Sequence, residues 1–216
     1  MIRFVHDVAA WDGALPGALV TPIPSGGHRR ELLQRMVAKA FDRTLDEVVI
    51  EHREGRRPTL SVPTAAGLFL SCASRAGVAA LAVAWSPIGV DVEIVDPLGT
   101  IPWNVLHPAE GAVLRALASD SRDRAFARLW SLKEAYLKAQ GLGLRREPSS
   151  FEIRVLDGQC AAVNDPDTGD GVAVASTVWL DTPHGRAAAS VVILNSQRSG
   201  TPRSSRDRSF QGRRRE

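Results

Sequence analysis

The sequence has few cysteines and no long apolar run. None of its 216 residues belong to an apolar stretch of the ~20 residues that cross a bilayer, and residues 1–10 include charged side chains where a secretory signal would be apolar. The two cysteines, Cys72 and Cys160, stand far apart and in no metal-binding spacing. We therefore expect two reduced thiols in a cytoplasmic protein that does not insert into a membrane.

Several nucleotide-binding and hydrolytic motifs are absent as well. The chain has no Gly-x-x-x-x-Gly-Lys-[Ser/Thr] loop, no Gly-x-Gly-x-x-Gly turn, no His-Glu-x-x-His helix and no Gly-x-Ser-x-Gly elbow. Its five histidines are scattered along the chain. These absences argue against P-loop, dinucleotide-binding, zinc-protease and α/β-hydrolase sites.

The formal net charge of +3 comes from the C-terminal end of the chain. Residues 196–216 hold seven arginines and two acids among polar residues, so the rest of the chain is slightly negative. Such a composition predicts a disordered basic tail. A polyanion-binding role would rest on this tail, whose one aromatic residue for base stacking is Phe210, and we do not expect nucleic acid as the partner.

Lysine is rare, since only three of the 27 basic residues are lysines. Two of them, Lys133 and Lys138, fall within six residues of each other. A local pair of lysines in an arginine-rich chain indicates a site that uses compact ammonium groups, although chance produces the same pattern.

Hydrophobic periodicity predicts a mixed α+β fold. We expect helices over 28–43, 108–118 and 122–140, and strands over 48–53, 77–85, 88–95, 151–156, 172–180 and 187–194. The last helix should stop at Gly141, and the last two strands should form a hairpin through residues 182–185. The loop after residue 95 suggests an N-terminal half over 1–95, a C-terminal half over 96–195 and the tail over 196–216.

The predicted strand at 89–94 reads Gly-Val-Asp-Val-Glu-Ile, which places Asp91 and Glu93 on one face and the apolar side chains on the other. Two adjacent carboxylates repel each other, and a hard divalent cation removes that repulsion. Oxygen ligands without a nearby His or Cys favour Mg²⁺ over zinc. The alternative is a half-exposed strand whose acids face water.

The helix expected over 122–140 contains the run Trp-Ser-Leu-Lys-Glu-Ala-Tyr-Leu-Lys at 130–138. Helical spacing places Glu134 on an apolar face, with Lys138 beside it. An ionised acid on an apolar face needs a partner, which is either Lys138 or the cation proposed for the strand acids.

These two segments, with 43 positions from Asp91 to Glu134, together resemble the paired signature of the 4'-phosphopantetheinyl transferase superfamily. Upstream, the family's longer members show, in the same order, the counterparts of His28-Arg29, Gly55-Arg56-Arg57-Pro58 and Leu70-Ser71-Cys72-Ala73-Ser74. The resemblance covers about residues 25–156. It implies the long, single-chain type that activates surfactin synthetase, a pseudo-dimer of two similar α+β halves with coenzyme A between them.

The resemblance also implies which residues form the site. Asp91, Glu93 and Glu134 would bind Mg²⁺, and Glu134 would act as the base toward the carrier serine, directly or through water. Lys133 and Lys138 would contact the phosphates, with Lys138 stabilising the departing 3',5'-ADP.

By the same resemblance, Arg29 and Arg57 would hold the nucleotide end of coenzyme A, and Ser71 would lie near its pyrophosphate. Cys72 departs from the family pattern, because many members have Ser-His-Ser where this chain has Ser-Cys-Ala-Ser. Either Arg75 or a backbone amide would then replace the histidine at the phosphate, or coenzyme A would bind less tightly.

The reaction implied is transfer of the 4'-phosphopantetheine group of coenzyme A to a serine of an apo acyl or peptidyl carrier protein, with release of 3',5'-ADP. The long type usually serves polyketide or nonribosomal peptide synthases, so we expect a monomer with their carrier domains as partners. Arg145 and Arg146 would meet an acidic carrier surface or face solvent. The alternatives are a non-catalytic coenzyme A or nucleotide-binding module and a polyanion-binding protein that acts through its basic tail.

Overall fold

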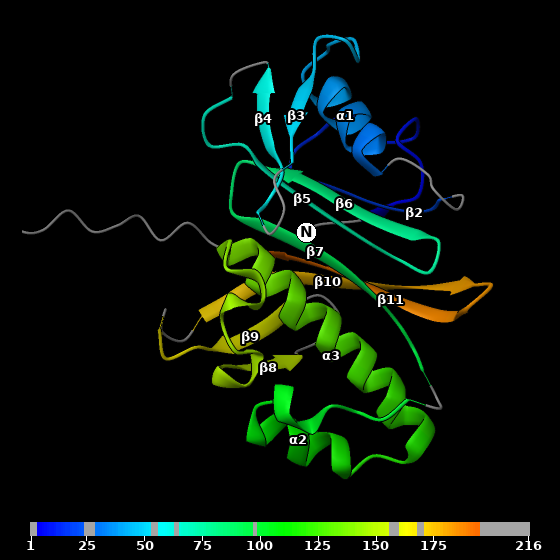
Figure 1. Ribbon diagram of the computed structural model, residues 1–216, viewed down its shortest axis with the longest axis vertical. Coiled ribbons are helices and arrows are strands. Elements are labelled where there is room, and N and C mark those ends of the chain that lie inside the picture. The colour runs from blue at the N-terminus through cyan, green and yellow to red at the C-terminus, as the bar shows by residue number, and fades with distance from the viewer. Residues whose placement is uncertain are drawn as a thin grey trace, which may run out of the picture.

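Two β-sheets with helical cover account for most of the chain in a computed structural model, which describes residues 4–23, 29–52, 56–62, 65–96, 99–155, 160–167 and 171–194 (Figure 1). The tail predicted to be disordered, 196–216, and His28 at the predicted start of the first helix lie outside these residues. Within the described ranges, no helix has both the length and the apolar character needed to cross a membrane.

The first sheet contains four strands, in the spatial order β1 (Phe4–Val5), β2 (Gly17–Pro22), β6 (Val78–Ala84) and β5 (Phe69–Arg75). β1 runs parallel to β2, and the other neighbours are antiparallel. Helix α1 (Arg29–Ala40) packs on this sheet through Leu33, Met36 and Val37. A separate hairpin consists of β3 (Val49–Glu51) and β4 (Thr59–Val62).

The second sheet contains five antiparallel strands, in the order β7 (Ile88–Ile94), β11 (Gly185–Ile193), β10 (Gly171–Thr182), β9 (Cys160–Asn164) and β8 (Glu152–Val155). Helices α2 (Pro108–Arg115) and α3 (Ser119–Gln140) accompany it. Short 3₁₀ helices occupy Trp103–Val105, Gly143–Arg145 and Pro148–Ser150. The predicted stop of the long helix is confirmed, because Gly141 caps α3 with a left-handed φ of 76°.

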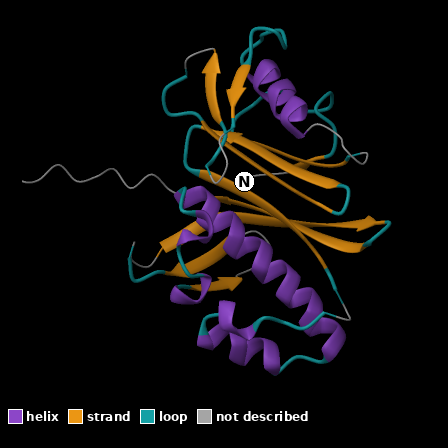
Figure 2. Cartoon of the chain, viewed as in Figure 1, coloured by secondary structure: helices purple, strands orange, loops and turns teal. Residues whose placement is uncertain are grey.

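Small side chains allow the two sheets to pack closely against each other. Their shared core contains alternate residues of the strands, among them Ala18, Ala80, Ala82, Val90, Val92, Ala187 and Ala189. Figures 1 and 2 show α1 on the outer side of the first sheet and α3 across β7 and β11 on the outer side of the second. Since strand side chains alternate, the face of β7 that carries Asp91 and Glu93 is turned away from this core.

The expected α+β class is confirmed, and each predicted helix and strand is present with ends that differ by a few residues. The hairpin through residues 182–185 is confirmed as well. β7 precedes the expected boundary at residue 95 but belongs to the second sheet, so the sheets divide the chain between β6 and β7. The sheets differ in strand number and order, and the pseudo-dimer of similar halves stays a prediction.

Candidate active site

A glycine brings α3 into direct contact with β7. A Cβ atom added to Gly89 would collide with the carbonyl oxygen of Ala135 and come within 2.6 Å of the Ala139 nitrogen. No side chain therefore separates the two backbones at this point. The close approach places Asp91, two residues further along β7, beside the last turns of α3.

Asp91 and Lys138 form an ion pair between β7 and α3. Lys138 Nζ donates to Asp91 Oδ1 at 2.6 Å, and Asp91 is only 6% exposed. Burial raises the pKa of Asp91, and the positive charge of Lys138 acts against this rise. The other carboxylate oxygen, Oδ2, is buried and has no hydrogen-bond partner among the described residues. A buried acceptor without a donor is costly, so this atom marks a position where a cation or donor would be stabilising.

Glu93 and Glu134 extend this acidic group. Burial raises the pKa of Glu93 to about 7, and the negative charges of Asp91 and Glu134 add to the rise, while Arg75 acts against it. Arg75 Nε lies 3.1 Å from Glu93 Oε2. Burial and the charge of Asp91 likewise raise the pKa of Glu134. The three acids thus lie close enough for their charges to act on one another.

The chemistry of this donor set fits a hard divalent cation. All its donors are carboxylate oxygens, each pKa is raised, and the Oδ2 atom of Asp91 has no partner in the described ranges. In the described part of the chain, however, no three His, Cys, Asp or Glu side chains are positioned to hold a metal ion. Lys138 instead pairs with Asp91, and Arg75 pairs with Glu93. A cation would therefore have to bind these carboxylates beside the basic side chains or displace them.

A pocket of about 510 Å³ opens beside Glu134 and Lys138, between the two halves of the chain, and Asp91 and Glu93 are not among its lining residues. The N-terminal half contributes Arg56, Arg57, Ser71 and Cys72 to its wall, and α3 contributes Glu134 and Lys138. A smaller pocket of about 360 Å³ shares both arginines with it. The structure therefore brings together four expected site residues, namely Arg57, Ser71, Glu134 and Lys138.

Arg57 reaches from the first half of the chain to the end of α3. Its guanidinium lies over the Phe69 ring, 5.3 Å from the centroid, and against Gly141. Burial lowers the pKa of Arg57. A guanidinium is nevertheless a group that stays charged in proteins. Together with Arg56 and Arg145 it gives the pocket wall a positive charge that suits phosphate groups.

Ser71 lines the pocket but already has a buried hydrogen bond. Its Oγ accepts the Val90 N–H at 3.0 Å, which links β5 to β7. Cys72 follows it on the pocket wall, and burial raises the pKa of its thiol, while the charges of Arg29 and Lys138 act against the rise.

Arg29 and Arg75 stand near this site without entering the pocket wall. Arg29 begins α1 and donates to Ser74 Oγ at 2.9 Å, and its charge acts on the Cys72 thiol. Arg75, one of the expected replacements for the histidine, is paired with Glu93. Neither arginine therefore reaches the pocket in this structure.

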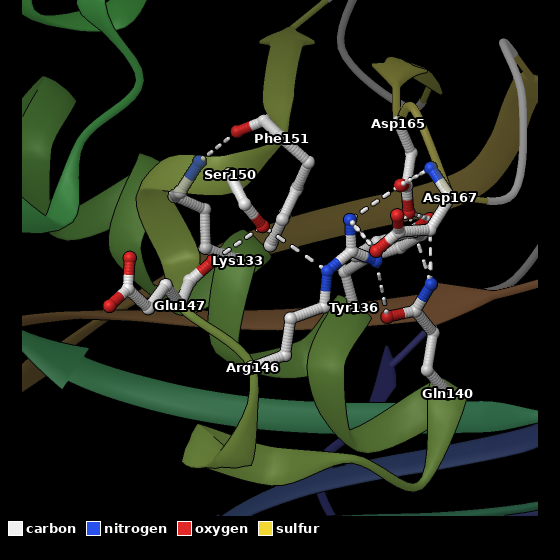
Figure 3. A network of polar contacts seen from close by, with 9 residues as sticks. All are labelled: Lys133, Tyr136, Gln140, Arg146, Glu147, Ser150, Phe151, Asp165 and Asp167. Carbon is white, nitrogen blue, oxygen red and sulfur yellow. Dashed lines mark hydrogen bonds and ion pairs between the residues drawn. The ribbon is translucent and has the colours of Figure 1, made fainter.

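Lys133 does not reach the pocket, and the expected phosphate contact is wrong for this residue. Its side chain is fully buried, and Nζ donates to the two Glu110 oxygens at 2.7 and 2.8 Å and to the Phe151 carbonyl oxygen at 2.8 Å (Figure 3 draws the last contact). One step along a helix rotates a side chain by ~100°. Lys133 therefore faces α2 and β8, while Glu134 faces the pocket.

A second group of polar side chains, not predicted from the sequence, holds the segment after α3 (Figure 3). Arg146 donates to both oxygens of Asp165, and Tyr136 Oη donates to Asp165 Oδ2 at 2.6 Å. Gln140 Nε2 reaches the same oxygen at 3.2 Å. Arg146 is thus turned into the protein, and only Arg145 of the two is exposed. No local pattern indicates this pairing, because Asp165 follows Arg146 by 19 positions, beyond two strands.

The family model of the 4'-phosphopantetheinyl transferase superfamily matches residues 87–192, which include Asp91, Glu93, Glu134 and Lys138. Through this region the chain belongs to that superfamily. The predicted resemblance is thereby confirmed. Arg29, Arg57 and Ser71 lie outside the matched residues, and of these three only Arg57 and Ser71 line the pocket.

Relatives of known name agree with this assignment. A 4'-phosphopantetheinyl transferase of Bacillus subtilis is 36% identical over 40% of this chain and 39% of its own length. The 4'-phosphopantetheinyl transferase HetI of Nostoc sp. is 29% identical over 52% of this chain and 54% of its own length. The chain thus spans about half or less of the length of these relatives.

Solved structures also resemble part of the chain. The crystal structure of Thermotoga maritima holo-[acyl-carrier-protein] synthase (AcpS) covers 51% of this chain and 64% of that chain, with a TM-score of 0.34 and 19% identity. That likeness is too slight to bear on the fold or on the site.

Proposed function

We propose that the protein is a Mg²⁺-dependent 4'-phosphopantetheinyl transferase. It moves the 4'-phosphopantetheine group of coenzyme A to a serine of an apo acyl or peptidyl carrier protein and releases 3',5'-ADP. The proposal rests on one observation, the convergence of Asp91, Glu134 and Lys138 beside a cationic pocket between the two halves. Superfamily membership of residues 87–192 supports it.

Asp91, Glu93 and Glu134 would hold the Mg²⁺ ion. Bound there, the ion would neutralise the pyrophosphate of coenzyme A and the negative charge that develops on it as its bond breaks. The raised pKa values of these acids and the unpartnered Oδ2 of Asp91, as far as the described residues extend, support this assignment.

The residues on the pocket wall suit the transfer chemistry. Glu134 takes the proton of the carrier serine hydroxyl, directly or through a water, and its raised pKa makes it a better proton acceptor than an ordinary glutamate. The serine oxygen bonds to the β-phosphorus while the bond from that phosphorus to the bridging oxygen breaks, and the electron pair leaves with 3',5'-ADP. Lys138, at the same wall, donates to the departing phosphate and offsets its charge.

The arginines on the other wall suit the nucleotide end of coenzyme A. Arg57 holds phosphate by charge and by its planar fork of donors. Arg29, at the start of α1, would have to leave Ser74 and extend toward the pocket to join it. Ser71 lines the pocket and would lie near the pyrophosphate, although its oxygen already accepts a backbone N–H. Lys133 has no part in binding, because it is buried on Glu110.

The long family type that the sequence resembles suggests a class of partner. We propose that the protein works in the cytoplasm, as a monomer, on carrier domains of polyketide or nonribosomal peptide synthases. Arg145 is exposed and lines the pocket, so it offers a contact for an acidic carrier surface near the reacting groups.

Intact-mass measurement of the carrier tests the function directly. A panel of apo-carriers is incubated with the protein, coenzyme A and Mg²⁺, with a chelator in one parallel reaction and a carrier lacking its serine in another. We expect one phosphopantetheine on each accepted carrier and none in either parallel reaction. If coenzyme A binds but no carrier gains mass, the non-catalytic module is the better description. Deletion of 196–216 should leave transfer unchanged, whereas a polyanion-binding protein would lose its function.

A further inference from the structure

A second pocket lies away from the proposed active site. The α2–α3 pocket, as we name it, has a volume of about 730 Å³ and is formed by α2, the first half of α3, β8 and the β10–β11 hairpin. It shares no lining residue with the pocket beside Glu134. Pockets that bind small organic molecules have volumes of about 300–1,000 Å³, so the α2–α3 pocket is of ligand size.

Apolar side chains form the floor and one rim of the α2–α3 pocket. Leu114 and Leu129 are buried beneath it, and Trp179 lies on its wall. Val113 at the rim is 64% exposed and Val155 is 38% exposed. Such exposed apolar side chains beside a hollow favour an occupant that covers them.

Arginines form the remainder of the rim. Arg128 is half-buried, its Nε has no hydrogen-bond partner, and its side chain makes no ion pair with any described residue. Burial lowers the pKa of this guanidinium, which is the sign of a charge held partly out of water without a counter-ion. Arg124 also lines the pocket, and Arg186 lies over the Trp179 ring, 5.2 Å from its centroid.

The acids of the α2–α3 pocket are already paired with other groups. Glu110 is held by Lys133 at 2.7 Å, and Glu152 lies 3.6 Å from Arg154. No described acid therefore pairs with the charge of Arg128, which is available to a bound anion. A planar guanidinium beside an apolar wall matches a carboxylate attached to an apolar chain.

We propose that the α2–α3 pocket binds a small amphipathic anion, an acyl carboxylate whose chain lies on Val113, Leu114 and Trp179 and whose carboxylate pairs with Arg128. The apolar chain of such a ligand matches the apolar side chains of the pocket, and its carboxylate matches the arginines. The site is independent of the proposed transferase activity, because the two pockets have no residue in common.

Calorimetric titration of the full chain with decanoate tests the proposal. We expect one decanoate per chain, with decanol and acetate each binding at least about tenfold more weakly, since each lacks one half of the recognised ligand. Failure of decanoate to bind would overturn the proposal. Equal binding of decanol would also overturn it, because the arginines would then contribute nothing.

Two variants with matched controls locate the decanoate. Arg128→Gln should weaken binding about tenfold or more, while Arg35→Gln, an exposed arginine on α1, should leave it unchanged. Val113→Asp places a carboxylate on the exposed apolar rim and should weaken binding similarly, while Val62→Asp, also exposed, should not. Thermal unfolding of each variant verifies that it is folded. If Arg128→Gln does not fold, Val113→Asp still tests the proposal, because Val113 is exposed and its substitution should not disturb the core.

A third variant separates the two pockets. Lys138→Met changes the wall of the pocket beside Glu134 and should leave decanoate affinity as in the parent. A loss of affinity equal to that of Arg128→Gln would place decanoate in that other pocket and overturn the proposal. Because the readout is binding of decanoate rather than transfer, its failure and the failure of the proposed transferase are distinguishable.

Discussion

Lys133 and Glu134 are consecutive residues of α3, yet their side chains enter different surroundings. The ammonium of Lys133 lies in the core on Glu110, whereas Glu134 lines the pocket between the halves. One residue therefore supports the fold and its neighbour is available to a substrate. Substitutions at the two positions should accordingly affect different measurements.

Lys133→Met should destabilise the protein strongly. It leaves the Glu110 carboxylate buried without its cation, and breaking a buried pair in this way costs about 3–5 kcal/mol of the free energy of unfolding. Urea unfolding measures the loss. The double variant Lys133→Met/Glu110→Gln, which removes both charges, should be more stable than the single variant. A Lys133→Met protein with parental stability and no transfer activity would contradict the buried role.

Glu134→Gln should abolish transfer and leave the fold intact. The amide keeps the shape of the side chain but cannot accept the serine proton, and general base catalysis contributes about 10²–10⁴-fold to a rate. The carrier modification rate and the thermal unfolding midpoint are measured together. Glu147→Gln, an exposed acid just after α3, is the control and should behave as the parent. Near-parental activity of Glu134→Gln would remove its role as base.

Lys138→Met should lower kcat more than it raises KM for coenzyme A. Its ammonium is proposed to offset charge on the departing phosphate, which develops only as the bond breaks. Steady-state kinetics with varied coenzyme A separates the two constants. An effect confined to KM would show that Lys138 serves binding. The variant also deprives Asp91 of its counter-ion. The unfolding transitions of the variant and of the parent should therefore be compared, both in the presence of chelator.

Ser71→Ala should reduce stability more than turnover. The Val90 N–H loses its acceptor in a buried place, which costs about 1–3 kcal/mol of the free energy of unfolding. Urea unfolding and the transfer rate per folded molecule are compared. Ser74→Ala, at the exposed end of the same strand, is the matched control. Parental stability together with lost activity would instead assign Ser71 to the pyrophosphate.

Local periodicity predicted the elements that carry the acids. The alternation of 88–95 placed Asp91 and Glu93 on one face, and Val90 and Val92 do lie in the core between the sheets. The strands β1, β2, β4, β5 and β9 were not predicted. Proline or glycine interrupts or borders several of them, which weakens the local strand pattern. β2 in addition pairs with β6, which follows it only after α1 and three further strands, so a local window does not contain its partner.

The side-chain partners were harder to predict than the elements. The family resemblance implied that Lys133 contacts the phosphates, and lysine is seldom buried, so no local pattern indicated that this side chain lies in the core. Its burial depends on Glu110, which stands on a different helix and also accepts the backbone N–H of Ile153 at 2.7 Å. Asp165 was not predicted for the same reason, because its partners Tyr136 and Arg146 are distant in the sequence and reach it only in the folded chain.

The absence of a side chain at residue 89 makes the site geometry a property of the main chain. Where two backbones touch directly, no rotamer change at the junction can alter their spacing. A single methyl group at this position would push the end of α3 outward and separate Lys138 from Asp91 in one movement. The geometry of the site is thus especially sensitive to mutation at a residue that takes no part in its chemistry.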